Sequence, residues 1–369
     1  MKSKKIIVAG LCLSLLSACG SSSDSKKVAT NPINSGDYQI VIPFESSDAR
    51  QVHVEYNRGD YDIMAVGKGL MEYSKAYFDP DSYYVQEGQL LNRDTLAVGT
   101  VYGDKEGILG FKSSDNTYGL NPEKGSKIPI SSTQTITSGS STVPIIDVFE
   151  IDFYQSLSDN AEITGLSFAI VLNPNITDAA GKAVTIKDKQ LKTLGEEAAR
   201  NLIAYLETLP QVGTKMPIMI SLFKANSSDS ALPGTFLEYG YGKDGIDSFT
   251  AVSEDQAIFP SDSATTLDSV TSTQFDSFKQ SLHLFLPNDI GVVGKGKFKD
   301  SKLNELSITI TAQTKTYTEC VALVQYTKDL LDTFKSKDIA ITVNVKNNNE
   351  TFAMLQRQSG SSDVNVIME

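Results

Sequence analysis

The feature that most constrains the fold is a helix followed by strands, an order that recurs in the second half of the chain. Residues 187–209 carry an apolar side chain at every third or fourth position, which predicts an amphipathic helix. The same spacing predicts helices over 275–287 and 321–334. Strand patterns follow these helices, at 216–224, at 290–299 with 305–313, and at 338–346 with 351–357. Strands in consecutive pairs indicate an α+β fold, with antiparallel sheets and helices packed on one face.

The first half of the chain is less regular. Residues 38–44 are predicted to form a strand and 62–78 a helix. Two polar stretches, 112–142 and 260–274, are expected to be loops. We therefore expect one extracytoplasmic α+β domain over residues 38–369, with a division into two lobes near 174–186 as an option.

The N-terminus predicts lipid attachment. Three lysines and a run of about twelve mostly apolar residues form a signal peptide, residues 1–18, that is shorter than the roughly 20 residues a spanning helix needs. It ends in a lipobox, Leu16, Ser17, Ala18 and Cys19, which lipoprotein processing enzymes acylate at Cys19 and cleave between Ala18 and Cys19. One diacylglyceryl group supplies the two chains that stable anchoring requires. The alternative is an ordinary secretory signal in which a cysteine follows the cleavage site by chance.

The cysteines and the net charge limit which disulfides and which binding partners the mature chain can have. The segment 19–37 is polar and without periodicity, which predicts a flexible tether. Cys12 lies in the signal peptide and Cys19 would carry lipid, so Cys320 has no cysteine to pair with and is expected to be a buried small hydrophobe. The net charge of −12 becomes −15 once the three lysines of residues 1–18 are removed. Such an acidic chain argues against nucleic-acid binding, and its contact with the membrane would come from the lipid.

The two histidines do not suggest a metal or catalytic site. His53 is expected on a strand and His283 on a helix, and neither has ligands at zinc spacing. No G-x-S-x-G sequence is present. We therefore expect both histidines to be structural or surface residues, and we expect no metal and no cofactor.

Three further patterns have a structural interpretation that we favour. Gly294 and Gly296 lie in an alternating strand pattern and lack the order of a phosphate-binding loop. The tripeptide 58–60, Arg-Gly-Asp, is typical of an ordinary turn, although it can bind integrins on a loop. Glu196 and Glu197 are expected near the start of a helix, where carboxylates suit the positive end of the dipole.

Several stretches of the chain resemble one family in order and in sequence. They are "YQIVIPF", "GLMEYSKAYFDPDSYYVQEGQLLNRDTL", "GLNPEKG", "GLSFAIVLNP", "MPIMISLFKANSSDSALPGTF" and "FLPNDIGVVGKGKFKDSKLNELSITI". The chain resembles the CamS sex-pheromone lipoproteins of Gram-positive bacteria. The resemblance implies an α+β domain at the outer face of the cell membrane and supplies no catalytic residues.

The resemblance also implies that the end of the signal peptide, residues 12–18, is released as a pheromone peptide. That segment, "CLSLLSA", has a cysteine and two serines where the pheromones it resembles are bulkier and more apolar. We therefore predict weak pheromone activity or none. For the mature domain we predict a binding or structural module rather than an enzyme, with an unidentified extracellular ligand or protein partner. The alternative is a solute-binding lipoprotein of an importer.

Overall fold

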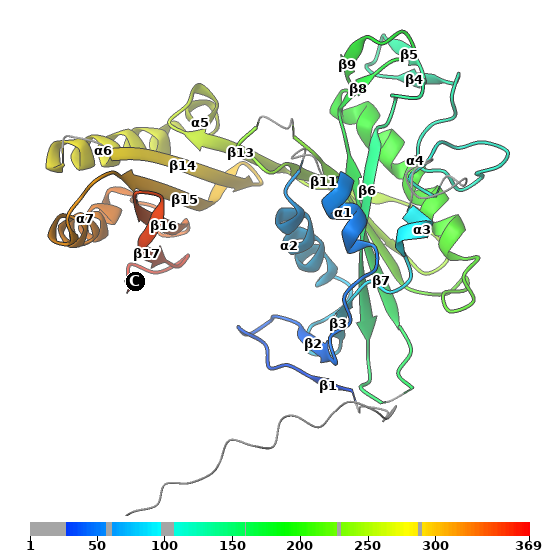
Figure 1. Cartoon of the computed structure of the whole chain (residues 1–369), viewed down its shortest axis with the longest axis horizontal. Helices are drawn as coiled ribbons and strands as arrows, with labels where there is room; N and C mark the ends of the chain where they lie inside the picture. The colour runs from blue at the N-terminus through cyan, green and yellow to red at the C-terminus, as the bar shows by residue number, and fades with distance from the viewer. Residues whose placement is uncertain (1–26, 57–60, 97–106, 159, 227–229, 287–289) are drawn as a thin grey trace, which may run out of the picture.

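The chain folds into two lobes, each built on its own sheet (Figure 1). The computed structural model describes residues 27–56, 61–96, 107–158, 160–226, 230–286 and 290–369. The expected α+β fold is confirmed. The two sheets separate between Val252 and Glu254, so the division does not coincide with the optional boundary at 174–186. That stretch forms a hairpin of β8 (Asn175–Thr177) and β9 (Ala183–Thr185) within the N-terminal lobe.

The N-terminal lobe contains an eight-stranded sheet. Its spatial order is β1 (Val28–Ala29), β2 (Gln39–Ile42), β3 (Tyr84–Glu87), β6 (Ile145–Tyr154), β7 (Gly165–Leu172), β10 (Ile218–Lys224), β11 (Thr235–Gly242) and β12 (Phe249–Ala251). Most neighbours are antiparallel, but β2–β3 and β7–β10 are parallel. Each parallel pair is joined by a crossover that carries helices, because parallel neighbours need a long connection.

Helices cover both faces of this sheet. On one face α4 (Asp188–Leu206) packs its apolar side chains against β7 and β10, and on the other α2 (Ile63–Ser74) packs against β6, β7 and β10. The short helices α1 (Arg50–Tyr56) and α3 (Arg93–Leu96) contact each other beside β6. Because β7 is covered on both sides, all of its residues are buried and its sequence does not alternate.

The C-terminal lobe contains a six-stranded sheet whose strands follow chain order. They are β13 (Glu254–Phe259), β14 (Ile290–Lys299), β15 (Lys302–Ala312), β16 (Ala340–Asn347), β17 (Glu350–Arg357) and β18 (Val364–Met368). Only β15–β16 is parallel, because α7 (Tyr317–Leu330) and the 3-10 turn η2 (Leu331–Thr333) cross between them. Together with α6 (Ser269–Phe285), α7 packs on one face of the sheet, and the strands alternate buried and exposed residues as a one-sided sheet requires.

Three polar segments differ from the expected loops and tether. The stretch 260–274 is largely helical, because Ser261 and Asp268 accept hydrogen bonds as N-caps of α5 (Asp262–Leu267) and α6. The stretch 112–142 includes a hairpin of β4 (Lys127–Pro129) and β5 (Thr135–Thr137). The tether joins the fold before residue 38, since β1 pairs with β2. Among the described residues, no helix combines the length and apolar composition that a bilayer crossing requires.

Candidate functional site

The main candidate site is a group of four half-buried tyrosines, which we call the tyrosine surface: Tyr73, Tyr77, Tyr239 and Tyr241. Tyr73 comes from α2, and Tyr77 lies one turn further along, just past the helix end. Tyr239 and Tyr241 alternate along β11 and therefore share one face of the sheet. The rings stack in two pairs, Tyr73 on Tyr239 at 5.2 Å and Tyr77 on Tyr241 at 4.2 Å between centroids.

Buried aromatic rings hold the tyrosine surface in place. The ring centroid of Phe236 lies 5.0 Å from that of Tyr73, and the ring centroid of Phe78 lies 6.1 Å from that of Tyr241.

Burial raises the pKa of both Tyr77 and Tyr241 above the ordinary value of 10.0. Their hydroxyl groups therefore stay protonated at neutral pH, so each can both donate and accept a hydrogen bond.

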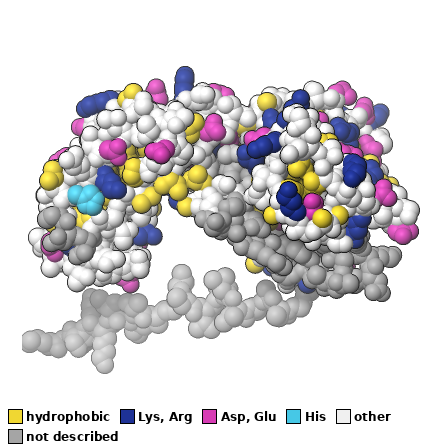
Figure 2. Space-filling view, turned by 90° about the horizontal axis from the view of Figure 1, so that it is seen from above, with side chains coloured by type: hydrophobic (Ala, Val, Ile, Leu, Met, Phe, Trp, Pro, Cys, Tyr) yellow, Lys and Arg dark blue, Asp and Glu magenta, His cyan; other side chains and the backbone are white. Residues whose placement is uncertain are grey.

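The tyrosine surface ends where the two lobes meet, at Glu254. The Tyr73 hydroxyl donates to Glu254 Oε1 at 2.5 Å, and the Phe236 N–H donates to Oε2 at 3.1 Å. Lys297 of β14 forms an ion pair with Glu254 at 3.5 Å, and Lys299 Nζ lies 5.6 Å from the centre of the Tyr73 ring. Glu254 thus joins α2 and β11 to the C-terminal lobe. Figure 2 shows hydrophobic side chains gathered on that lobe where it borders the gap between the lobes.

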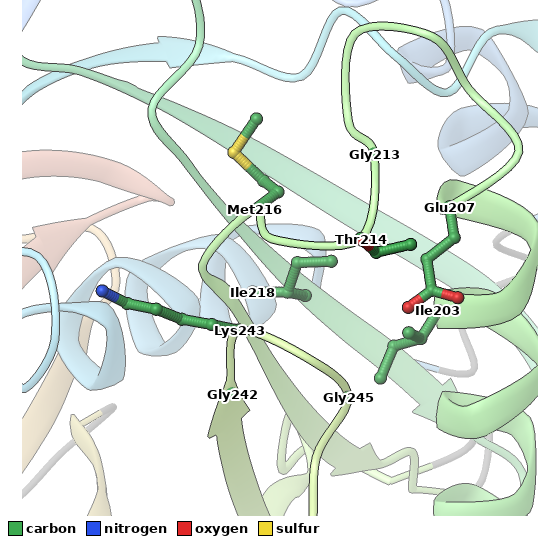
Figure 3. Close-up of a pocket in the computed structure, with 9 residues that line it drawn as sticks. All are labelled: Ile203, Glu207, Gly213, Thr214, Met216, Ile218, Gly242, Lys243 and Gly245. Carbon is green, nitrogen blue, oxygen red and sulfur yellow. The ribbon is translucent and has the colours of Figure 1, made fainter.

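The hollows found in the N-terminal lobe are poor candidates for a catalytic pocket. One, between α4 and the end of β11, measures about 10 Å³, which is room for about one water molecule. Figure 3 shows Glu207 on its wall and Lys243 pointing away from that carboxylate. Another, about 610 Å³, is a groove between α4 and residues 112–129. Its charged lining side chains are exposed and of both signs: Lys112, Glu123, Lys127 and Glu197.

A second cluster of polar groups is buried on the opposite face of β6 from Phe149 and Phe153. Glu150 accepts hydrogen bonds from the backbone N–H groups of Leu90 at 3.0 Å and Leu91 at 2.8 Å. Asp152 accepts one from the N–H of Gln89 at 2.9 Å. Glu150 and Asp152 are two positions apart on β6, so their side chains lie on the same face of the sheet, and both are buried there.

This carboxyl pair predicts that stability falls as pH rises. Burial raises the pKa of Glu150 above 4.5, and burial followed by the charge of Glu150 raises that of Asp152 well above 3.8. The folded chain therefore binds more protons than the unfolded chain above about pH 4, and the free energy of unfolding decreases until both groups have ionised. We expect Asp152→Asn to reduce this slope, measured as the urea midpoint against pH. An identical slope in both proteins would contradict the prediction.

His53 belongs to another buried polar cluster, which the sequence did not predict. It lies on α1 rather than on a strand, and its ring stacks on Phe149 with centroids 4.0 Å apart. Its Nδ1 is 2.8 Å from Asp147 Oδ2, and the Tyr61 hydroxyl donates to the same carboxylate. His53 and Asp147 are 94 positions apart, so no local pattern could have predicted the pair.

The remaining predicted residues have structural surroundings where the structure describes them. A Cβ on Gly294 would lie 2.8 Å from Phe275, and one on Gly296 would lie 2.6 Å from Phe259, so these glycines allow close packing inside the C-terminal lobe. Cys320 is 1% exposed, as expected, and burial raises the pKa of its thiol. His283 is half-buried on α6.

The predicted position of Glu196 and Glu197 is wrong, and the predictions for the N-terminal segment are not tested by the structure. Glu196 and Glu197 lie in the middle of α4, not at its start, and Glu196 forms an ion pair with Arg200 at 3.9 Å. The residues of the lipobox, the segment 12–18 and the tripeptide 58–60 lie outside the described residues. Within the described ranges, no three His, Cys, Asp or Glu side chains are grouped so that they could hold a metal ion.

Comparisons with known proteins agree on one family. A family model described as CamS sex pheromone cAM373 precursor matches residues 44–363. The crystal structure of a sex pheromone precursor from Lactobacillus salivarius subsp. salivarius has a TM-score of 0.78 at 26% identity, covering 93% of this chain and 98% of that one. The C-terminal domain of the staph-cAM373 precursor from Staphylococcus aureus has the same fold, with a TM-score of 0.63 at 20% identity over 84% of this chain and 96% of that one. No curated protein matches the chain.

Proposed function

The chain belongs to the CamS family of sex pheromone precursors, and we propose that it is a lipid-anchored binding module on the outer face of the cell membrane. Lipoprotein processing enzymes would acylate Cys19 and remove residues 1–18. The mature domain would be non-catalytic and would bind an extracellular ligand or protein through the tyrosine surface. The observation that carries this proposal is the two pairs of stacked, half-buried tyrosine rings beside the junction of the lobes.

Tyrosine rings suit this task because they combine a large apolar face with a hydroxyl group that stays in contact with water. The rings of the tyrosine surface are fixed by Phe78 and Phe236, so little side-chain freedom would be lost on binding. Tyr73 is also bonded to Glu254 of the other lobe. A ligand on this surface would therefore contact residues that are coupled to both lobes.

The proposed anchor is tested by labelling cells with a clickable palmitate analogue. The wild-type protein is expected to take up the label, whereas Cys19→Ala is expected to lose both the label and retention in the membrane fraction. Cys320→Ala is the matched control and should keep both, because Cys320 is buried. Equal labelling of wild type and Cys19→Ala would rule out the anchor.

The binding role is tested by thermal shift against peptides, glycans, amino acids and metal ions. A compound that binds the tyrosine surface should raise the melting temperature of wild type and not of Tyr77→Ala or Tyr241→Ala. Tyr317→Ala is the control, because Tyr317 is 69% exposed on α7 and lies outside the tyrosine surface.

The two-lobed shape favours one alternative function, that of a solute-binding lipoprotein of an importer. A response to one small nutrient that survives both tyrosine substitutions would support that alternative.

The signal peptide is the proposed source of a released peptide, residues 12–18. A receptor that binds bulkier apolar pheromones gains roughly 1.5–3 kcal/mol for each large side chain that it buries, and serine supplies little of this. Synthetic "CLSLLSA" is therefore expected to act weakly or not at all on cells that respond to such pheromones. Plasmid transfer at nanomolar doses of the peptide would contradict this expectation.

A further inference from the structure

In the part of the chain that the structure describes, the eight-stranded and the six-stranded sheet together have four edge strands, and three of them are protected. An edge strand exposes unpaired backbone N–H and C=O groups, which proteins shield with short strands, charges or covering elements. β1 has only two residues and β12 only three. β13 begins with Glu254 and Asp255, and α5 and β11 contact it.

The fourth edge, β18, has none of these protections. It has five residues, Val364, Asn365, Val366, Ile367 and Met368. It contains no proline and no charged residue, and its pairing with β17 is regular. Within the described residues, β18 is paired on one side only. This edge also lies beyond residues 44–363, which the family model matches.

The hydrogen-bond register shows which groups of β18 face outward. The N–H of Glu369 donates to the carbonyl of Phe352, so this opposed pair is a hydrogen-bonded one. Hydrogen-bonded and non-bonded pairs alternate along an antiparallel ladder. Asn365 and Ile367 therefore bond to β17, whereas the N–H and C=O groups of residues 364, 366 and 368 point to the free edge.

Two exposed apolar side chains lie side by side at the same edge. One cross-strand row on the open face of the sheet runs through Thr309, Asn344, Met354 and Ile367, each directly opposite the next. Thr309 on β15 and Asn344 on β16 are polar, and the row continues beyond Thr309 to Val293 of β14, which is 47% exposed. The two at the edge are apolar and exposed, Met354 at 41% and Ile367 at 60%. An apolar patch beside open backbone groups is the composition of a strand-pairing interface.

We propose that β18 pairs antiparallel with β18 of a second copy of this chain, joining the two C-terminal sheets into one. In the register centred on Ile367, residue 366 of each copy hydrogen-bonds with residue 368 of the other copy. These bonds use backbone N–H and C=O groups that face outward on both strands. The two Ile367 residues face each other as a non-bonded pair, with Cα atoms about 4.5 Å apart. The patch of Met354 and Ile367 then continues into its copy.

Charge is compatible with this pairing. Residues 364–368 are uncharged, and the register places Asn365 opposite Glu369, so it opposes no like charges. The net charge of −15 that remains after removal of residues 1–18 is spread over the chain and is screened beyond about 8 Å at physiological ionic strength. One strand pair is a small interface, and we expect a weak association that attachment to one membrane surface would strengthen by raising the local concentration.

The test is disulfide formation in intact cells that express the full chain with Ile367→Cys. Mild oxidation with copper phenanthroline removes two electrons and two protons from the facing thiols and should give a covalent dimer on a non-reducing gel. Asn365→Cys, two residues away on the same face, is the matched control. In the proposed register its thiol lies opposite residue 369, not opposite its own copy, so it should form at least tenfold less dimer.

A second substitution separates strand pairing from random collision. Val366→Pro, added to Ile367→Cys, removes an N–H that faces the free edge and leaves the bonds to β17 intact. It should abolish the dimer without lowering the melting temperature by more than a few degrees. Leu284→Cys, 77% exposed on α6, measures collisional cross-linking. Equal dimer from the cysteines at positions 284 and 367, or an Ile367→Cys adduct with a different protein only, would overturn the proposal.

Discussion

Gly88→Ala is expected to lower the free energy of unfolding by roughly 3 kcal/mol or more. A Cβ on Gly88 would lie 2.3 Å from Cβ and 2.4 Å from Cγ of Glu150, which is buried and cannot swing into solvent. Overpacking alone costs about 1–3 kcal/mol. Movement of Glu150 would also release the N–H groups of Leu90 and Leu91, at about 1–3 kcal/mol for each buried donor left unpaired. Urea denaturation followed by circular dichroism measures the loss.

Gly67→Ala is the matched control for this prediction. Gly67 lies on α2, and a Cβ there would meet no atom within 4 Å. Because alanine has a higher helix propensity than glycine, this variant should gain about 0.5–1 kcal/mol. Opposite signs for the two variants are expected. A Gly88→Ala protein as stable as wild type would show that Glu150 does not require the glycine.

The sequence predicted those elements whose apolar side chains follow one period. The helix expected over 187–209 is α4, at Asp188–Leu206, and the alternating strand over 290–299 is β14. Helices and strands that are buried on both faces were harder to predict from the sequence, because their apolar residues follow no period. β7, for example, lies between α2 and α4, so its eight buried residues carry no period that could be recognised.

Helix capping and contacts between distant segments account for the other differences between the structure and the sequence-based predictions. The serines and threonines of 260–274 indicated a loop, yet Ser261 and Asp268 use their polarity to begin two helices. The candidate site depends on contacts between distant segments. Tyr73 and Tyr77 showed helical spacing, but nothing local indicated that they stack on Tyr239 and Tyr241.

Glu254→Ala is expected to lower the free energy of unfolding by roughly 2–4 kcal/mol and to loosen the two lobes from each other. The side chain of Glu254 is 4% exposed, and its loss leaves the Tyr73 hydroxyl and the Phe236 N–H without their acceptor. Each unpaired group costs about 1–3 kcal/mol if it stays buried. Two other polar contacts join the lobes: the side-chain amide of Gln256 donates to the carbonyl of Gly234 at 2.7 Å, and Lys68 forms an exposed ion pair with Glu305 at 3.4 Å, which contributes little.

Calorimetry and hydrogen exchange distinguish lost stability from separated lobes. Wild type is expected to unfold with the lobes coupled, whereas Glu254→Ala should show two separable transitions and faster exchange at the N–H of Phe236. Glu254→Gln is the control, because its carbonyl oxygen can still accept one of the two hydrogen bonds, and it should lie between the other proteins. If the alanine variant keeps a single transition at the wild-type temperature, Glu254 does not join the lobes. The tyrosine surface would then belong to the N-terminal lobe alone, and a ligand bound there would have no route to the C-terminal sheet.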